Sequence, residues 1–218
     1  MKKQHVLIFS TLLLLIIVVT STYLFRGSQD NKVAQTTDIK KDSQLVRWTS
    51  PKQGSNKAKV TLVEFLDPAC ETCSQFHPFV KKLLASHPGK LKLVVRHAPF
   101  HHGSDVMVKI LEAAKVQGKY WETLEVMLKT QPYWTSNHKA QPEQFFKYLP
   151  SIGLNEEQIR KGMDSPGIAI RVEQDIADTI GLGIKKTPGF FVNGKPLSRF
   201  GYDELQNLVE SEIRKNYQ

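Results

Sequence analysis

The two cysteines of the chain lie three positions apart, as Cys70-Glu71-Thr72-Cys73. A structural disulfide usually closes a longer loop, because its entropic stabilisation grows with the length of the loop. A zinc site would normally need two further ligands at suitable spacing. A C-x-x-C pair is otherwise typical of an exchangeable dithiol, in which a thiolate is the nucleophile. The spacing alone leaves these alternatives open, so the neighbouring elements must decide between them.

The cysteines stand at the junction between a predicted strand and a predicted helix. Residues 60–66 are apolar and rich in β-branched side chains, as in a buried strand. After Cys73, apolar residues recur at helical spacing up to residue 84. The unpaired N–H groups and the dipole of a helix stabilise an anion at its first turn. We therefore expect Cys70 to be the exposed attacking thiolate, with a lowered pKa, and Cys73 to be the more buried resolving thiol.

One carboxyl group interrupts the apolar strand. Glu64 lies between Val63 and Phe65, shortly before Cys70. Burying a lone carboxyl group is unfavourable unless it has a partner or a function in proton transfer. We hypothesise that Glu64 lies beneath the dithiol and exchanges a proton with Cys73 as the disulfide opens and closes. The alternative is a glutamate at a strand edge that faces solvent, which the apolar flanking residues disfavour.

The remaining pattern predicts an α/β fold, with a central sheet, helices on its faces and a helical insertion at about 103–181. Apolar stripes at helical spacing within this range indicate core packing rather than ligand binding. The other predicted elements are strands at 91–98 and 190–192, a turn at Asn193-Gly194, a return strand from Lys195 and a helix at about 202–213.

Two motifs resemble those of the DsbA-type branch of the thioredoxin superfamily. The first is V-E-F-x-D-P-x-C-x-x-C, which ends at Cys73, and the second is G-I-x-x-T-P-x-F-F-V-N-G-K, which ends at Lys195. A helical region separates them, and the resemblance extends over about residues 58–216. It implies a thioredoxin-like fold with a helical insertion and the activity of a thiol:disulfide oxidoreductase.

The resemblance also implies functions for single residues. Pro188 would follow a cis peptide bond and pack beside the dithiol, and Thr187 would offer backbone hydrogen bonds to a bound substrate segment. The buried acidic residue of the family corresponds to Glu64. The best-known oxidases of the family carry Pro-His between the cysteines, where this chain has Glu71-Thr72. We expect the Glu71 carboxylate to raise the pKa of Cys70 and to make the dithiol a weaker oxidant.

The N-terminal residues predict a membrane anchor. Residues 6–25 carry no charge and follow two lysines. A helix of this length, at about 1.5 Å per residue, spans roughly 30 Å, which is the thickness of the hydrocarbon core. The lysines favour a cytoplasmic N-terminus. We expect an uncleaved anchor at 1–27 in the cytoplasmic membrane, with the rest of the chain in the periplasm or extracytoplasmic space. A cleaved signal peptide is the alternative, and it would export the domain equally.

The residues after the anchor are polar. Residues 28–57 predict a tether, except for Leu45-Val46-Arg47-Trp48, which offers a segment to dock at the edge of the domain. The thioredoxin-like domain is predicted at 58–218. The formal net charge is +9, but no basic run alternates with aromatic residues as in a nucleic-acid site. We expect a solvated, lysine-rich surface and no nucleic-acid partner.

The predicted function is oxidation or exchange of cysteines in exported proteins, through a mixed disulfide on Cys70 that Cys73 resolves. The expected partners are cysteine-containing exported proteins and a membrane or extracytoplasmic redox partner, and no cofactor is expected. A tethered reductase or an isomerase is the alternative among enzymes, and a chaperone or metal-binding module on the same scaffold is the alternative outside them. Histidines at 97, 101 and 102 could suggest copper, but a solvated loop is the simpler interpretation, so no metal site is predicted.

Overall fold

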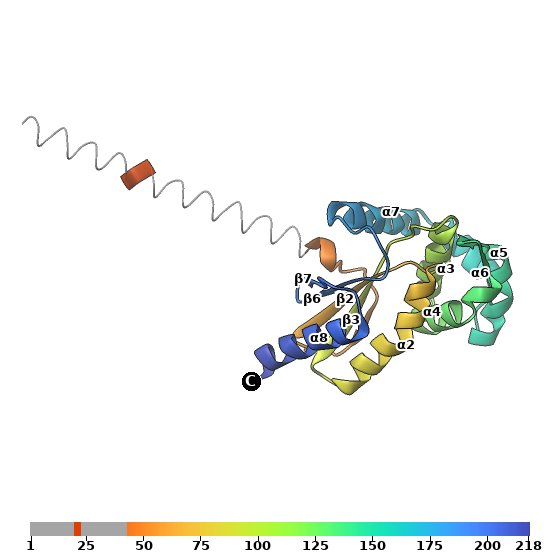
Figure 1. Cartoon of the computed structure of the whole chain (residues 1–218). Coiled ribbons are helices and arrows are strands. Elements are labelled where there is room, and N and C mark those ends of the chain that lie inside the picture. The colour runs from red at the N-terminus through yellow and green to blue at the C-terminus, as the bar shows by residue number, and fades with distance from the viewer. Residues whose placement is uncertain (1–19, 23–42) are drawn as a thin grey trace, which may run out of the picture. The chain divides into compact units, whose positions relative to one another are not determined.

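Figure 1 shows the computed structural model of the chain, in which residues 20–22 and 43–218 are described. The chain divides after Ser43, and the unit Gln44–Gln218 contains all the elements discussed below. The predicted anchor, with its apolar run 6–25, lies outside the described residues except at 20–22. Among the residues that are described, no helix has both the length and the apolar character needed to cross a membrane.

A five-stranded sheet forms the centre of the domain, in the order β1-β3-β2-β6-β7. The central strands β2 (Val60–Leu66) and β3 (Leu91–His97) run parallel to each other. The other strands pair antiparallel with their neighbours: β1 (Lys52–Gly54), β6 (Gly189–Val192) and β7 (Lys195–Pro196). Both central strands are buried along most of their length, as their runs of apolar residues predicted.

The two faces of the sheet belong to two separate apolar cores. On β2, Leu62 and Leu66 pack in the larger core, together with residues of α2 (Glu71–Ser86) and α8 (Tyr202–Tyr217). Val63 and Phe65 pack in the smaller core on the opposite face of the sheet. Because side chains alternate between the faces of a strand, Glu64 lies on the face of β2 that α2 and α8 cover.

Helices fill the chain between β3 and β6, and Figure 1 shows them grouped beyond one end of the sheet, with α7 apart from the others. A short hairpin that the sequence did not predict lies among them. These elements are α3 (Ser104–Val116), α4 (Tyr120–Lys129), the 3-10 helix η1 (Gln131–Tyr133), the hairpin strands β4 (Thr135–Ser136) and β5 (Lys139–Ala140), α5 (Pro142–Phe145), η2 (Phe146–Ile152), α6 (Glu156–Met163) and α7 (Pro166–Gly181).

The folded unit begins at Gln44, earlier than the expected boundary at residue 58. Leu45 is buried in the smaller core, and the Arg47 guanidinium lies 2.7 Å from the Asp178 carboxylate on α7. Trp48 does not dock and is 90 % exposed. Strand β1 follows within the predicted tether. Its sequence, Lys-Gln-Gly, carries no apolar pattern, so only the backbone pairing with β3 reveals it as an edge strand.

Candidate active site

A tight turn after β2 presents the dithiol. The Asp67 carboxylate accepts a hydrogen bond from the Ala69 amide at 2.8 Å, and the Cys70 amide donates to the Asp67 carbonyl at 3.1 Å. Cys70 has extended backbone angles and is the N-cap residue of α2, and Cys73 lies in the first turn of that helix. The predicted junction between strand and helix is therefore confirmed. Both cysteines are free thiols.

Cys73 is buried as expected, whereas Cys70 is more enclosed than expected. Cys73 is fully buried, and Cys70, expected to be exposed, has an exposed fraction of only 7 %. The Cys70 sulfur lies 3.3 Å from the Thr187 carbonyl oxygen, so the segment before Pro188 lies against it. Of the two sulfurs, that of Cys70 remains the more accessible to a reactant.

The pKa values of the two thiols are driven apart. A hydrogen bond from the Cys73 thiol lowers the pKa of Cys70 to about 6, assisted by the backbone N–H groups of Cys73 and Thr72 and opposed by burial. Burial raises the pKa of Cys73 well above its ordinary value, and the charges of Cys70 and Glu64 raise it further. At neutral pH the reduced dithiol therefore holds a thiolate on Cys70 and a proton on Cys73.

Glu71, the residue after Cys70, has a partner from a distant part of the chain. Its carboxylate lies 3.2 Å from the imidazole Nδ1 of His138, a residue of the β4–β5 hairpin. The pKa of Cys70 is lowered, with the hydrogen bond from Cys73 as the largest cause. The lowered pKa agrees with the place of Cys70 at the start of α2, and the effect of Glu71 relative to a Pro-His pair stays a prediction.

Glu64 is fully buried on the face of β2 that α2 covers, so it does not face solvent. Burial and the charge of Cys70 raise the pKa of Glu64 to about 8. Among the described residues, neither carboxylate oxygen of Glu64 has a hydrogen-bond partner. A carboxyl group with this pKa holds a proton in much of the population at neutral pH.

A groove borders the dithiol on the side of the second motif. The Thr187–Pro188 peptide bond is cis, as the resemblance implied. The groove has a volume of about 420 Å³ and combines backbone at Thr187 with apolar side chains. Its lining residues are Thr72, Lys186, Thr187, Pro188, Gly189, Phe190, Leu197, Ser198 and Phe200. Thr187 thus lines this groove and also contacts Cys70, while Cys73 is fully buried.

Two residues that we did not predict hold the dithiol turn in place. Asp67 is fully buried, and its carboxylate also accepts hydrogen bonds from the amides of Phe100 and His101 at 2.7 and 2.9 Å. The Gln131 side-chain amide donates to the carbonyl oxygens of Pro68 and Cys70 at 2.7 and 3.0 Å. Asp67 stands in the first motif and could have been found there, whereas no sequence signal marks Gln131.

The three histidines considered for copper differ in their surroundings. His97 is buried, and its two ring nitrogens lie 2.9 Å from the Asp175 carboxylate and 2.8 Å from the Tyr120 hydroxyl. His101 contacts Asp67, and His102 is exposed. Because both nitrogens of His97 are engaged in the interior, the three side chains do not form one site.

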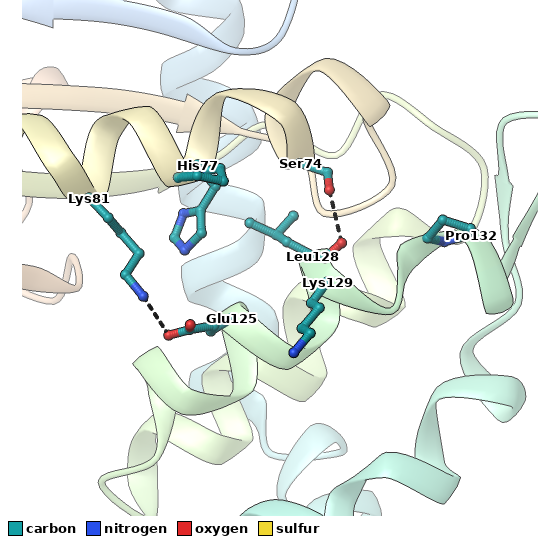
Figure 2. A pocket seen from close by; sticks show the side chains of 8 residues that line it. Ser74, His77, Lys81, Glu125, Leu128, Lys129 and Pro132 are labelled. Atoms are coloured by element: carbon teal, nitrogen blue, oxygen red, sulfur yellow. Dashed lines mark hydrogen bonds and ion pairs between the residues drawn. The ribbon is translucent and has the colours of Figure 1, made fainter.

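A second groove lies between α2 and α4, and Figure 2 shows its side chains. Its volume is about 470 Å³, and it contains neither cysteine. The Lys81 ammonium lies 2.8 Å from the Glu125 carboxylate across it, and Ser74 donates a hydrogen bond to the Leu128 carbonyl at 2.9 Å. Burial lowers the pKa of His77 in its wall. These contacts join the two helices, and they bring no nucleophile or redox group together.

Comparison with known proteins agrees with this geometry. A family model described as thioredoxin matches residues 47–211. The chain belongs to this thioredoxin family. The disulfide bond formation protein D of Bacillus subtilis is 26% identical over 85% of this chain and 86% of its own length. The crystal structure of oxidised BdbD from Bacillus subtilis has a TM-score of 0.67 and 26% identity, covering 76% of this chain and 94% of that one.

Another group of relatives is much longer than this chain. The Na(+)/H(+) antiporter NhaA of Herminiimonas arsenicoxydans is 34% identical over 69% of this chain. The chain spans about a quarter of the length of that protein, since the match covers 23% of it. The agreement over nearly the whole of protein D and BdbD confirms the resemblance to the DsbA-like branch of the thioredoxin superfamily.

Proposed function

We propose that the protein is a thiol:disulfide oxidoreductase that forms or exchanges disulfides in exported proteins through Cys70 and Cys73. The observation that carries this proposal is the asymmetry of the dithiol. Cys70 is the more accessible sulfur and the better leaving group, because hydrogen bonds at the start of α2 lower its pKa to about 6. Cys73 is enclosed and retains its proton, as a resolving thiol should.

In the proposed reaction a substrate thiolate attacks the Cys70 sulfur of the Cys70–Cys73 disulfide. The bond between the two cysteines breaks, a disulfide between substrate and Cys70 forms, and Cys73 leaves as a thiolate that takes a proton from Glu64. A second substrate thiolate then attacks the substrate sulfur, and Cys70 leaves as a thiolate. The substrate loses two electrons and the dithiol gains them, which a redox partner later accepts.

Glu64 is suited to the proton transfer in this scheme. Its pKa of about 8 lies close to neutral pH, so it can both donate and accept a proton there. A negative charge on Glu64 disfavours a thiolate on Cys73, and a thiolate on Cys73 disfavours a negative charge on Glu64. Protonation of one group therefore favours ionisation of the other. Glu64 is therefore proposed as the proton donor and acceptor for Cys73.

The groove beside the dithiol supports a substrate site for an extended peptide. Thr187 would pair its backbone with the peptide, and Pro188 would keep the paired segment next to Cys70. Apolar side chains such as Phe190 and Leu197 line the groove. We propose that these contacts recognise the unfolded backbone around a substrate cysteine rather than one sequence.

The membrane location is part of the proposal. An anchor at 1–27 and a tether after it would hold the thioredoxin-like domain, with its insertion at about 103–181, in the periplasm or extracytoplasmic space. A disulfide catalyst is useful there, because thiols are kept reduced in the cytoplasm. The same position would give access to a redox partner in or near the cytoplasmic membrane.

Catalysed oxidative refolding tests the proposed function. The oxidised full chain should accelerate recovery of a reduced, unfolded enzyme that needs disulfides, and Cys70→Ser should abolish the acceleration. We expect a reduction potential between those of DsbA and thioredoxin, about −120 and −270 mV, because the pKa of Cys70 is lowered only to about 6. Unchanged activity of Cys70→Ser would refute the proposal in favour of a chaperone. A potential at or below that of thioredoxin would instead indicate a reductase.

A further inference from the structure

Three potential metal ligands meet near the start of α2. Glu71, His101 and His138 each offer one ligand atom, and these atoms all lie within 4.8 Å of one another. The two imidazole rings are close to parallel, with centroids 6.0 Å apart. Ligand atoms around tetrahedral zinc, with bonds of about 2.0–2.1 Å, lie roughly 3.4 Å apart. Small side-chain rotations would therefore bring the three atoms to zinc-binding distance.

His101 is oriented as metal-bound histidines usually are. Its Nδ1 lies 2.6 Å from the buried Asp67 carboxylate, and its backbone amide donates to the same carboxylate at 2.9 Å. Because a carboxylate accepts but does not donate, Nδ1 is the donor in this contact, which leaves Nε2 as the nitrogen that can bind a metal. A carboxylate that fixes the tautomer of a ligating histidine is a recurrent feature of metal sites.

Backbone contacts place His138 beside His101. The Ala140 amide of the β4–β5 hairpin donates to the His102 carbonyl at 2.9 Å, and His102 forms a parallel bridge with Lys139. Gly103 permits this approach, because a Cβ atom there would lie 2.9 Å from the Ala140 carbonyl oxygen. The hairpin tip is thus attached to the loop that carries His101, and the cluster does not depend on side-chain contacts alone.

We propose that Glu71, His101 and His138 bind one Zn²⁺ ion. Two neutral imidazoles and one carboxylate suit zinc and similar divalent transition metals, whereas calcium and magnesium prefer sites made of oxygen ligands. Glu71 and His138 are exposed, with side-chain exposed fractions of 49% and 73%, so water can complete the coordination. Such a site would exchange its metal with solvent. It is separate from the dithiol, although Glu71 directly follows Cys70.

Calorimetric titration of the full chain in detergent with zinc chloride tests the proposal. The protein is first oxidised, because the Cys70–Cys73 disulfide removes the thiolates as competing ligands. We expect one Zn²⁺ per chain. Glu71→Gln and His138→Ala should each weaken binding by about 10-fold or more. Both side chains are exposed, so neither change threatens the fold.

His102→Ala is the matched control, because His102 is an exposed histidine of the same loop outside the cluster. Its affinity for zinc should equal that of the unaltered chain. Binding of Co²⁺ should give visible absorption bands without a thiolate-to-metal charge-transfer band. Absence of binding to the oxidised chain, or equal affinities in all three variants, would overturn the proposal. Neither outcome depends on redox activity, so the proposed function is tested independently.

Discussion

The pKa of Cys70 provides the sharpest test of the electrostatics at the dithiol. It is lowered from the ordinary value of 9.0 to about 6, with the Cys73 thiol as the largest cause. This difference corresponds to about 4 kcal/mol in favour of the thiolate. A single hydrogen bond to a charged group contributes about 1.5–3 kcal/mol, which equals roughly 1–2 pH units. Cys73→Ala removes this donor, so the pKa of Cys70 should rise by about that amount.

The assay is the pH dependence of thiolate ultraviolet absorbance, checked by the rate of alkylation with iodoacetamide. The burial of Cys73 raises its pKa well above its usual value, so the first ionisation of the reduced chain reports on Cys70. Cys73→Ser is the matched control, because its hydroxyl can still donate to the Cys70 sulfur. In Cys73→Ser the pKa of Cys70 should stay near its value in the unaltered chain. Equal pKa values in the alanine and serine variants would refute the assignment of the hydrogen bond.

Three further predictions concern stability. Because the pKa of Glu64 is raised to about 8 by folding, the folded chain binds the proton more tightly than the unfolded chain, and stability falls as pH rises from about 4.5 to 8. Glu64→Gln should therefore be more stable than the unaltered chain at pH about 8, with the difference shrinking towards pH about 4 in urea unfolding. The lowered pKa of Cys70 has the opposite effect on stability, because the folded chain releases this proton more readily than the unfolded chain. The free energy of unfolding of the reduced chain should therefore rise relative to that of the oxidised chain between about pH 6 and 9. A difference that stays constant over this range would contradict the prediction. Leu45→Ala should lower the free energy of unfolding by about 2–5 kcal/mol, whereas Trp48→Ala should change it by less than about 0.5 kcal/mol. Equal effects would show that the folded unit does not begin at Gln44.

The elements that carry the dithiol could be predicted because each has a strong local pattern. Strand β2 is a continuous apolar run, α2 has apolar residues at helical spacing, and the Asn193-Gly194 turn has positive φ at both residues, as this pair favours. Strand β1 could not be predicted, because an edge strand of three polar residues forms through backbone pairing alone.

The surroundings of the dithiol were harder to predict than its position. Cys70 and Cys73 follow from their spacing, and the structure buries Glu64 as predicted and places Thr187 against Cys70. The contact between Glu71 and His138 could not be predicted, because the two residues are far apart in sequence. Only the hairpin between η1 and α5 brings His138 close, and its strands of two residues leave no recognisable pattern.

Trapping of the mixed disulfide tests the central claim most directly. The Cys70 thiolate attacks the disulfide of an oxidised peptide, one peptide sulfur leaves as a thiolate, and the other stays bonded to Cys70. Because the resolving thiol is absent, Cys73→Ser should accumulate this covalent complex. Mass spectrometry should locate the bond at Cys70, and Cys70→Ser should form no comparable complex. A complex that forms on Cys73 in the Cys70→Ser chain, or none in either variant, would contradict disulfide exchange through Cys70.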